Sequence, residues 1–189
     1  MRCLINEKAN GNVRRVGMKI AEMDKLLQKI AAGDNAAFEE LYAKTKRGVF
    51  AFLHTYLQNY ADTEDAMQTV YLKIKTGISS YRTGTNGRAW ILQIAKNHAL
   101  NELKKRRATA SLDDVELVAK AEPIAESGVM EVMERVLTGE ERRIVTLHVL
   151  WGYKHREIGK ILDLPTGTVT SKYKRSIEKL QKNLKEVEA

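Results

Sequence analysis

The chain has 189 residues and a formal net charge of +8 at pH 7, with 43% hydrophobic and 30% charged residues. This composition suits one large or two small packed domains that face a polyanion, most simply nucleic acid, although a basic helix on a membrane surface gives similar totals. Cys3 is the only cysteine, which excludes an intramolecular disulfide and a cysteine-based zinc site, and no apolar run approaches the roughly 20 residues of a membrane helix. We therefore expect a cytoplasmic protein without stable membrane insertion.

The N-terminal part is predicted to be helical after an irregular lead. Residues 1–18 show no helical periodicity and lack the apolar core of a signal peptide, so we expect them to be disordered. Apolar residues then recur at helical spacing over 20–30, and Gly33-Asp34 is predicted to end this helix and to cap the next one. A long helix or a broken pair of helices is expected over 38–56.

A third helix is predicted to begin at Asp62, with Val70, Tyr71 and Ile74 on its apolar face. Residues 77–87 are rich in Gly, Ser, Thr and Asn, which predicts a loop. The first domain is thus expected to be a helical bundle whose fourth helix follows this loop.

The fourth helix, predicted from Arg88 to about Arg106, has two unlike faces. Trp90 falls on the apolar face and is more simply a core residue than a base-stacking one. The opposite face is rich in amides, which read base edges or hold unpaired bases, whereas a merely solvated face favours Lys and Glu. This candidate DNA stripe consists of Gln93, Asn97, Asn101 and Lys104. The neighbouring loop adds three groups suited to grip an unstacked base, namely Tyr81, Asn86 and Arg88.

Charge is sorted along the chain into two basic blocks around an acidic one. Residues 88–107 carry six Lys/Arg against one acid, and residues 142–185 carry eleven against three. Between them, residues 108–141 carry nine Asp/Glu against two basic residues. The sorting predicts two polyanion-facing surfaces joined by an acidic tether that a polyanion would repel. We therefore expect a first domain over 19–107, an acidic linker over 108–127 and a second domain over 128–185.

The second domain is also predicted to be helical. Thr138–Glu141 fits a capping box that opens a helix, and Gly152 is a plausible stop for that helix. Two further helices are expected over 155–162 and 168–184, with the turn at Asp163–Gly167 between them.

A short helix, a tight turn and a longer basic helix form the helix-turn-helix pattern of DNA-binding proteins. Gly159 supplies a small residue where the two helices cross, and Val169 and Tyr173 can face the core. An ordinary helical hairpin with a solvated basic face has the same spacing, so the pattern alone leaves both alternatives open. The outward face of the second helix carries side chains that neutralise phosphates or read bases: Thr168, Thr170, Ser171, Lys172, Lys174 and Arg175.

No recognisable enzyme chemistry is present in the sequence. The four histidines lack the spacing of a metal site, no Ser or Cys has a base motif nearby, and there is no phosphate-binding glycine loop. The acidic cluster Asp113-Asp114-Glu116 is more simply a solvated linker than a site for a divalent ion. We expect no catalytic residue, no metal, no cofactor and no small-molecule substrate.

Four segments resemble one family, the bacterial RNA polymerase sigma factors of the extracytoplasmic-function (ECF) group. Gly33-Asp34 with Ala37–Tyr42 resembles the opening of the family's conserved region 2, and Ala61–Lys73 is similar to the segment that docks on the polymerase clamp. Arg88–Asn97 resembles the helix that faces the −10 promoter element, and Pro165–Val169 opens a helix similar to the −35 reader of region 4. Together these segments extend the resemblance to nearly everything outside the lead and the linker.

The resemblance implies an all-α fold of two small helical domains, a region 2-like bundle and a region 4-like helix-turn-helix, joined by the acidic linker. It implies that loop 81–88 and Asn97 capture a flipped base of the −10 element, that the outward face of the last helix contacts the −35 element, and that the linker enters the polymerase's basic channel. The implied partners are core RNA polymerase, promoter DNA and, in some family members, a restraining anti-sigma factor. The surface facing the polymerase clamp would include Asp65, Gln68, Tyr71 and Lys73.

Three positions depart from the family's pattern. Thr69 stands where an acidic residue is usual, Thr170 where a basic one is usual, and Tyr173 where an aliphatic one is usual. The change at Thr170 bears most on DNA sequence preference, because threonine cannot make the bidentate contact of arginine.

Two rival functions fit parts of the sequence. A stand-alone helix-turn-helix regulator with an N-terminal effector or dimerisation domain explains the C-terminal half equally well, but it leaves the amide stripe without a role. A nucleic-acid-processing enzyme is a more distant alternative that no motif supports. The interpretation that uses both halves is a sigma factor that binds core polymerase, recognises the −35 and −10 elements and promotes promoter melting.

Overall fold

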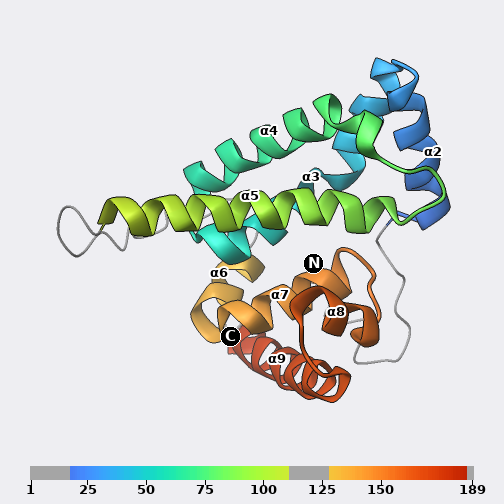
Figure 1. Cartoon of the computed structure of the whole chain (residues 1–189). Coiled ribbons are helices and arrows are strands. Elements are labelled where there is room, and N and C mark those ends of the chain that lie inside the picture. Colours follow the sequence, from blue (N-terminus) through green and yellow to red (C-terminus); the bar gives the residue numbers. More distant parts are fainter. Residues whose placement is uncertain (1–17, 111–127, 187–189) are drawn as a thin grey trace. The chain divides into compact units, whose positions relative to one another are not determined.

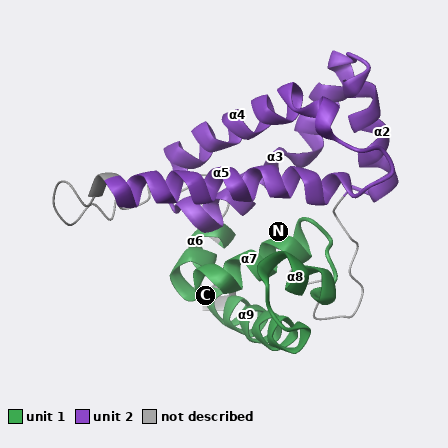
Figure 2. Ribbon diagram, in the orientation of Figure 1, with its two compact units in different colours: residues 1–17, 123–189 green, residues 18–122 purple. Residues whose placement is uncertain are grey.

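The computed structural model describes residues 18–110 and 128–186, and the chain divides into two compact units, residues 18–122 and residues 1–17 with 123–189 (Figure 1 and Figure 2). Every regular element in the described ranges is a helix, which confirms the all-α prediction. Residues 1–17 of the predicted lead and 111–127 of the predicted linker lie outside the described residues.

The first unit is a bundle built around one central helix. Helix α3 packs against α2, α4 and α5, and α4 and α5 also pack against each other (Figure 1). A fully buried large apolar side chain contributes roughly 1.5–3 kcal/mol to stability. The elements are α2 (Ile20–Ala31), α3 (Asn35–Leu57), α4 (Tyr60–Thr76), the 3₁₀ helix η2 (Ile78–Ser80) and α5 (Gly87–Ala110). The largest fully buried side chains of the first unit include Leu27, Leu41, Phe52, Leu53, Ile74 and Ile91.

Polar side chains fix where the helices of the first unit begin. Gly33, at φ +90°, ends the α2 segment, and the Asp34 carboxylate accepts the Ala37 N–H at 3.0 Å, as predicted. Helix α3 is continuous, which decides between the two alternatives left by the sequence. Helix α4 begins at Tyr60 rather than at the predicted Asp62. Asn59 is its N-cap, because the Asn59 side chain accepts the Asp62 N–H at 3.0 Å.

Helix α5 is longer than the sequence predicted. The Asn86 side chain accepts the Ala89 N–H at 3.2 Å, which sets the start of the helix at Gly87. The helix ends at Ala110 rather than near Arg106, so the first three residues assigned to the acidic linker are helical.

The second unit consists of α6 (Gly128–Val136), α7 (Gly139–Val149), α8 (His155–Leu162) and α9 (Thr166–Glu186). Helix α9 packs against each of the other three. The predicted capping box is confirmed, since Thr138 Oγ1 accepts the Glu141 N–H and the Glu141 carboxylate accepts the Thr138 N–H at 2.9 Å. One core cluster consists of Val129, Val132, Met133, Leu137, Val145, Val149 and Leu180.

Helices α8 and α9 form a helix-turn-helix whose turn is closed by a glycine. A Cβ on Gly159 would lie 2.6 Å from the Leu164 carbonyl oxygen, and the Leu164 N–H donates to the Gly159 carbonyl at 2.8 Å. Gly159 is therefore required where the turn and the first residue of α9, Thr166, approach α8. Asp163, at φ +58°, ends α8 in the left-handed conformation.

Candidate nucleic-acid interface

The amide stripe of α5 lies on the exposed face of that helix. Gln93, Asn97, Asn101 and Lys104 are all exposed, whereas Ile91, Leu92, Ala95 and Ala99 on the other face are buried. The Gln93 side-chain amide donates to the Asn97 side-chain oxygen at 2.7 Å. This bond orients the Asn97 amide and leaves its N–H groups available to an acceptor on a ligand.

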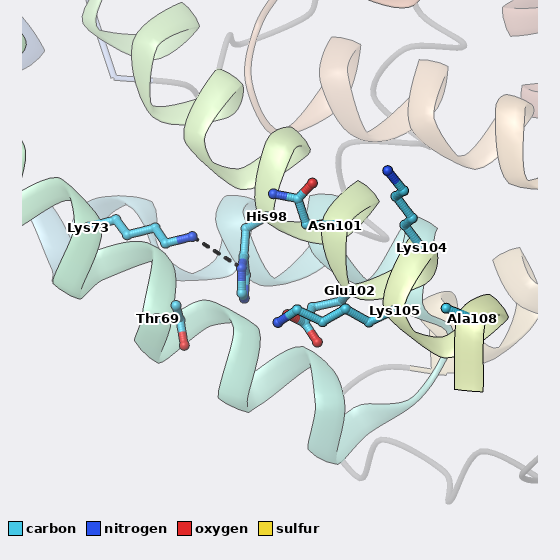
Figure 3. Close-up of a pocket in the computed structure, with 8 residues that line it drawn as sticks. All are labelled: Thr69, Lys73, His98, Asn101, Glu102, Lys104, Lys105 and Ala108. Atoms are coloured by element: carbon cyan, nitrogen blue, oxygen red, sulfur yellow. Dashed lines mark hydrogen bonds and ion pairs between the residues drawn. The ribbon is translucent and has the colours of Figure 1, made fainter. Parts of the chain in front are cut away.

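A groove of about 590 Å³ runs between α4 and α5 and joins residues that the sequence assigned to different partners (Figure 3). Lys73, predicted to face the polymerase, points toward His98, which projects from α5. Its ammonium nitrogen lies 3.4 Å from His98 Nδ1. Asn101 and Lys104, predicted to face DNA, line the same groove. Lys73 therefore lies on the side of α4 that faces α5.

The charge of this groove comes from lysines rather than from the histidine. His98 is buried, and that burial, reinforced by the positive charge of Lys73, lowers its pKa. Glu102 is engaged by Lys105 at 2.9 Å. With His98 neutral and Glu102 paired, Lys73 and Lys104 give the groove a net positive character suited to a phosphate group.

A second hollow of about 290 Å³ adjoins the groove, since both are lined by Lys73, His98 and Asn101. Trp90 and Ile94 supply an apolar wall, and Asn97 supplies an amide. Trp90 is half-buried rather than a core residue, and its ring centroid lies 5.2 Å from that of Tyr81. An aromatic wall beside an orienting amide is the chemistry that stacks and holds an unpaired base.

The loop before α5 differs from its predicted role in one respect. The side-chain oxygen of Asn86 caps α5, and the Tyr81 hydroxyl donates to Asp24 at 2.5 Å, so these groups are already engaged within the protein. Arg88 is half-buried. The exposed part of the loop consists of residues 82–85.

On the outer face of α4, one residue predicted to contact the polymerase is buried, and one exposed residue was not predicted. Tyr71 is only 4% exposed: its hydroxyl lies 2.7 Å from Thr45 Oγ1, and burial raises its pKa. It is a core residue and is not available to a partner. Leu72, which the sequence analysis did not select, is 62% exposed. Leu72 lies seven residues after Asp65 and four after Gln68, both of which are exposed, so it shares their face of the helix. Helical spacing alone was therefore enough to predict that Leu72 is part of this surface.

The recognition helix α9 presents most of its predicted residues to solvent. Thr170, Ser171, Lys174 and Arg175 are exposed, and Thr168 is half-buried. Lys172 differs, because its ammonium pairs with Glu140 of α7 at 2.6 Å. The side chain of Lys172 is thus directed at α7 and is less available to DNA than the sequence suggested.

Two histidines pack around Tyr173, one of the three residues that depart from the family's pattern. The ring centroid of Tyr173 lies 4.6 Å from that of His148 and 5.0 Å from that of His155. Thr170 Oγ1 donates to the Thr166 carbonyl and also lies within hydrogen-bond distance of His155 Nδ1, at 3.1 Å. His155, which sequence reasoning did not select, thereby orients a side chain of the recognition face.

Two classes of feature are absent from residues 18–110 and 128–186. No group of three or more His, Cys, Asp or Glu side chains in these ranges could hold a metal ion. No helix in the same ranges is long and apolar enough to cross a membrane.

The fold and these surfaces define a class: a protein of two helical units, one with a hollow lined by an aromatic ring and an amide and one with a helix-turn-helix. The family model of sigma-70 region 2 matches residues 41–109, and that of sigma-70 region 4 matches residues 134–180. RNA polymerase sigma factor CarQ of Myxococcus xanthus is 28% identical over 170 residues, which cover 86% of this chain and 97% of CarQ. ECF RNA polymerase sigma factor SigM of Mycobacterium tuberculosis is 28% identical over 165 residues, which cover 85% of this chain and 83% of SigM. The chain belongs to the ECF group of RNA polymerase sigma factors.

Two solved structures share the fold. CnrH, in complex with the cytosolic domain of CnrY, aligns with a TM-score of 0.58 at 18% identity, covering 87% of this chain and 98% of CnrH. The sigma factor RpoE of Bartonella quintana, in complex with the anti-sigma factor NepR, aligns with a TM-score of 0.59 at 21% identity, covering 78% of this chain and 96% of RpoE. Taken together, the comparisons favour a sigma factor over a stand-alone helix-turn-helix regulator.

Proposed function

We propose that the two units divide promoter recognition: the first binds core polymerase and the opened −10 element, and the second binds the duplex −35 element. The observation that carries this proposal is the exposed amide stripe of α5 beside the hollow walled by Trp90. Duplex-reading helices need no such hollow, whereas a helix that holds unpaired bases does.

At the −10 element, an unstacked base lies against Trp90 and meets the Asn97 amide, while Lys73 and Lys104 neutralise the neighbouring phosphates. Base stacking on an aromatic side chain is worth about 1–3 kcal/mol per base. Opening a duplex costs about 1.4 kcal/mol for each base-pair step. A few captured bases therefore offset much of the cost of melting, with no catalytic chemistry from this chain.

Polymerase binding falls to the outer face of α4. Asp65 and Gln68 supply polar groups, and Leu72 supplies an exposed apolar side chain between them and the end of the helix. Such an arrangement, one apolar anchor with a polar rim, is typical of a small recognition surface.

At the −35 element, Thr170, Ser171, Lys174 and Arg175 of α9 face the DNA. Each unit alone is a small, weak DNA binder, and both bound to one polymerase act as a linked pair. We place the acidic segment 108–127 in the polymerase's basic channel, where its charge stands in for nucleic acid.

A restraining partner is a second part of the proposal. The structures of CnrH with CnrY and of RpoE with the anti-sigma factor NepR motivate it. A protein that covers Leu72 would compete with the polymerase. This part is tested by letting such a protein and core polymerase compete for binding to the wild type and, separately, to the Leu72→Ala variant.

The central experiment is run-off transcription with core polymerase on a genomic fragment library, with and without the protein. On a promoter found in this way, we expect Asn97→Ala to impair opening more than it impairs polymerase binding. Asn183→Ala, which removes an amide bonded to the Lys179 carbonyl in the other unit, is the matched control. Equal loss of opening and polymerase binding with Asn97→Ala would contradict the assignment.

A further inference from the structure

The loop between η2 and α5 is tied to the start of the unit, at Asp24 of α2. Asp24 Oδ1 accepts the Tyr81 hydroxyl at 2.5 Å and the Gly84 N–H at 3.1 Å. Its second oxygen accepts the side-chain amide of Gln28 at 3.0 Å. The Asp24 carboxylate thus accepts hydrogen bonds from Tyr81, the first residue of the loop, and from Gly84 in its middle.

Both bonds to the loop are tertiary contacts, since Asp24 is 57 residues from Tyr81 and 60 from Gly84. Within the loop, Thr85 N–H and Thr85 Oγ1 both donate to the Arg82 carbonyl, which closes a local turn. Gly84 adopts φ +80°, a conformation that other residues rarely adopt and that turns its N–H toward Asp24. Without Asp24, the turn would remain but would lose these two hydrogen bonds to α2.

The other end of the loop rests on the same part of α2. A Cβ on Gly87 would lie 2.6 Å from Leu27 Cδ1, 3.2 Å from Met23 Cγ and 3.3 Å from the Tyr81 hydroxyl oxygen. Leu27 and Met23 are core residues with at most 1% exposure. Helix α2 is therefore a rigid support for both ends of the loop, and Asp24 is its polar contact.

The ionised form of Asp24 is the one that holds the loop. The hydrogen bond from Tyr81, followed by that from Gly84, lowers the pKa of the carboxyl group. A carboxylate that accepts these bonds near neutral pH makes charge-assisted contacts, which are stronger than those of a neutral acceptor.

We infer that Asp24 is a positioning residue for promoter opening, which fixes the loop 81–86 and the Tyr81 ring beside the hollow walled by Trp90. This inference rests on the proposed function of that hollow. Tyr81 lies 5.2 Å from Trp90 between ring centroids, so a shift of Tyr81 changes the wall against which a base stacks. A loop fixed in advance removes an ordering cost that would otherwise accompany each capture of a base.

The test uses the full chain with core polymerase on a promoter carrying 2-aminopurine in the −10 element. The variants are Asp24→Ala, Tyr81→Phe, which keeps the ring but loses the bond, and Gln28→Ala, which removes only the third partner of Asp24. We expect Asp24→Ala to reduce open-complex formation about tenfold, the order of effect that lost preorganisation produces. Tyr81→Phe shows a smaller loss in the same direction, and Gln28→Ala shows none.

Base selectivity separates positioning from simple destabilisation. Each protein is assayed on templates with all four bases at the captured position and on a premelted template. We expect Asp24→Ala to flatten the selectivity among bases and to recover activity on the premelted template, at unchanged affinity for core polymerase. Asp24→Asn, which keeps a side-chain oxygen acceptor, restores part of the selectivity.

The outcomes distinguish this inference from the proposed function. If the wild type discriminates among bases and Asp24→Ala discriminates equally well, the inference is wrong and the proposed function stands. If the wild type shows no dependence on the base, the proposed function itself fails. Should Asp24→Ala not fold, judged by circular dichroism, then Tyr81→Phe decides: wild-type opening and selectivity in that variant overturn the inference.

Discussion

Helices α5 and α9 are both long and basic, yet their polar faces are built in different ways. The exposed face of α9 is supported by neighbours close in sequence, such as His155, which bonds Thr170 from 15 residues away. The surface around α5 is completed by α4 and by a loop bonded to Asp24, across 57 to 60 residues. The face of the helix-turn-helix thus relies more on neighbours within its own unit's last three helices, whereas the surface that we propose for the −10 element depends on segments from most of the first unit.

The largest expected effect tests how self-contained the second unit is. Gly159→Ala places a Cβ 2.6 Å from the Leu164 carbonyl, and overpacking of this kind costs about 1–3 kcal/mol of unfolding free energy. Gly167→Ala, where nothing lies within 4 Å, is the control and is expected to be neutral or stabilising by up to about 1 kcal/mol. Denaturant unfolding followed by Trp151 fluorescence in a Trp90→Phe background measures both. Equal midpoints would show that the turn tolerates a side chain.

Two adjacent residues of α4 provide the second test, now in the first unit. Leu72→Ala removes an exposed anchor, so we expect core polymerase affinity to fall by about tenfold, the usual scale for a contact of this kind, with unfolding unchanged. Tyr71→Phe removes the contact with Thr45 and should cost about 0.5–1.5 kcal/mol of stability with no change in affinity. Fluorescence-anisotropy titration with core polymerase and denaturant melts give the two readouts. A loss of core polymerase affinity in Tyr71→Phe would show that Tyr71 does contact the polymerase.

Two lysines of α9 separate a DNA contact from an internal one. Lys174→Ala should weaken binding of the polymerase complex to −35 DNA and reduce the slope of log affinity against log salt by about 1. Lys172→Ala should change the slope less, because its ammonium already pairs with Glu140. Binding measured across a salt series reports both slopes, and identical slopes for the two variants would show that the pair opens on DNA.

The smallest effect concerns the pH dependence of the first unit. Burial and the charge of Lys73 lower the pKa of His98, so the folded state favours the neutral ring. Its contribution to stability is therefore present above the unfolded pKa of about 6.5 and is lost progressively as the pH falls below that value. Unfolding followed by Trp90 in a Trp151→Phe background, from about pH 7.5 to 5.5, should show a steeper loss for wild type than for His98→Gln. Parallel curves would assign the acid sensitivity to other groups.

Local sequence signals predicted the parts of the fold that depend on local chemistry. The cap at Asp34 and the box at Thr138 were readable because donor and acceptor lie three residues apart. The cap at Asn86 follows the same local rule, since this Asn lies three residues before Ala89 at the start of a helical pattern, although the side chain is predicted to contact DNA.

Contacts between distant segments were not predictable in this way. Lys172 pairs with Glu140 across 32 positions, and the loop residue Tyr81 bonds Asp24 across 57. Nothing in the residues around either one indicates its partner, because the pairing follows from how the helices pack. The sequence places Tyr71 on both an apolar face and a contact face, and its burial in the packed unit assigns it to the core.

Positions 71 and 72 of α4 are adjacent but are under opposite structural constraints. Tyr71 is fixed by the core that surrounds it, so most replacements there compromise the whole unit. Leu72 is free of the core, and its replacement alters only what the outer surface of α4 meets. If Leu72 contacts a partner as we propose, a duplicated copy of this chain needs a change at only one exposed position to lose that partner, and its fold is retained.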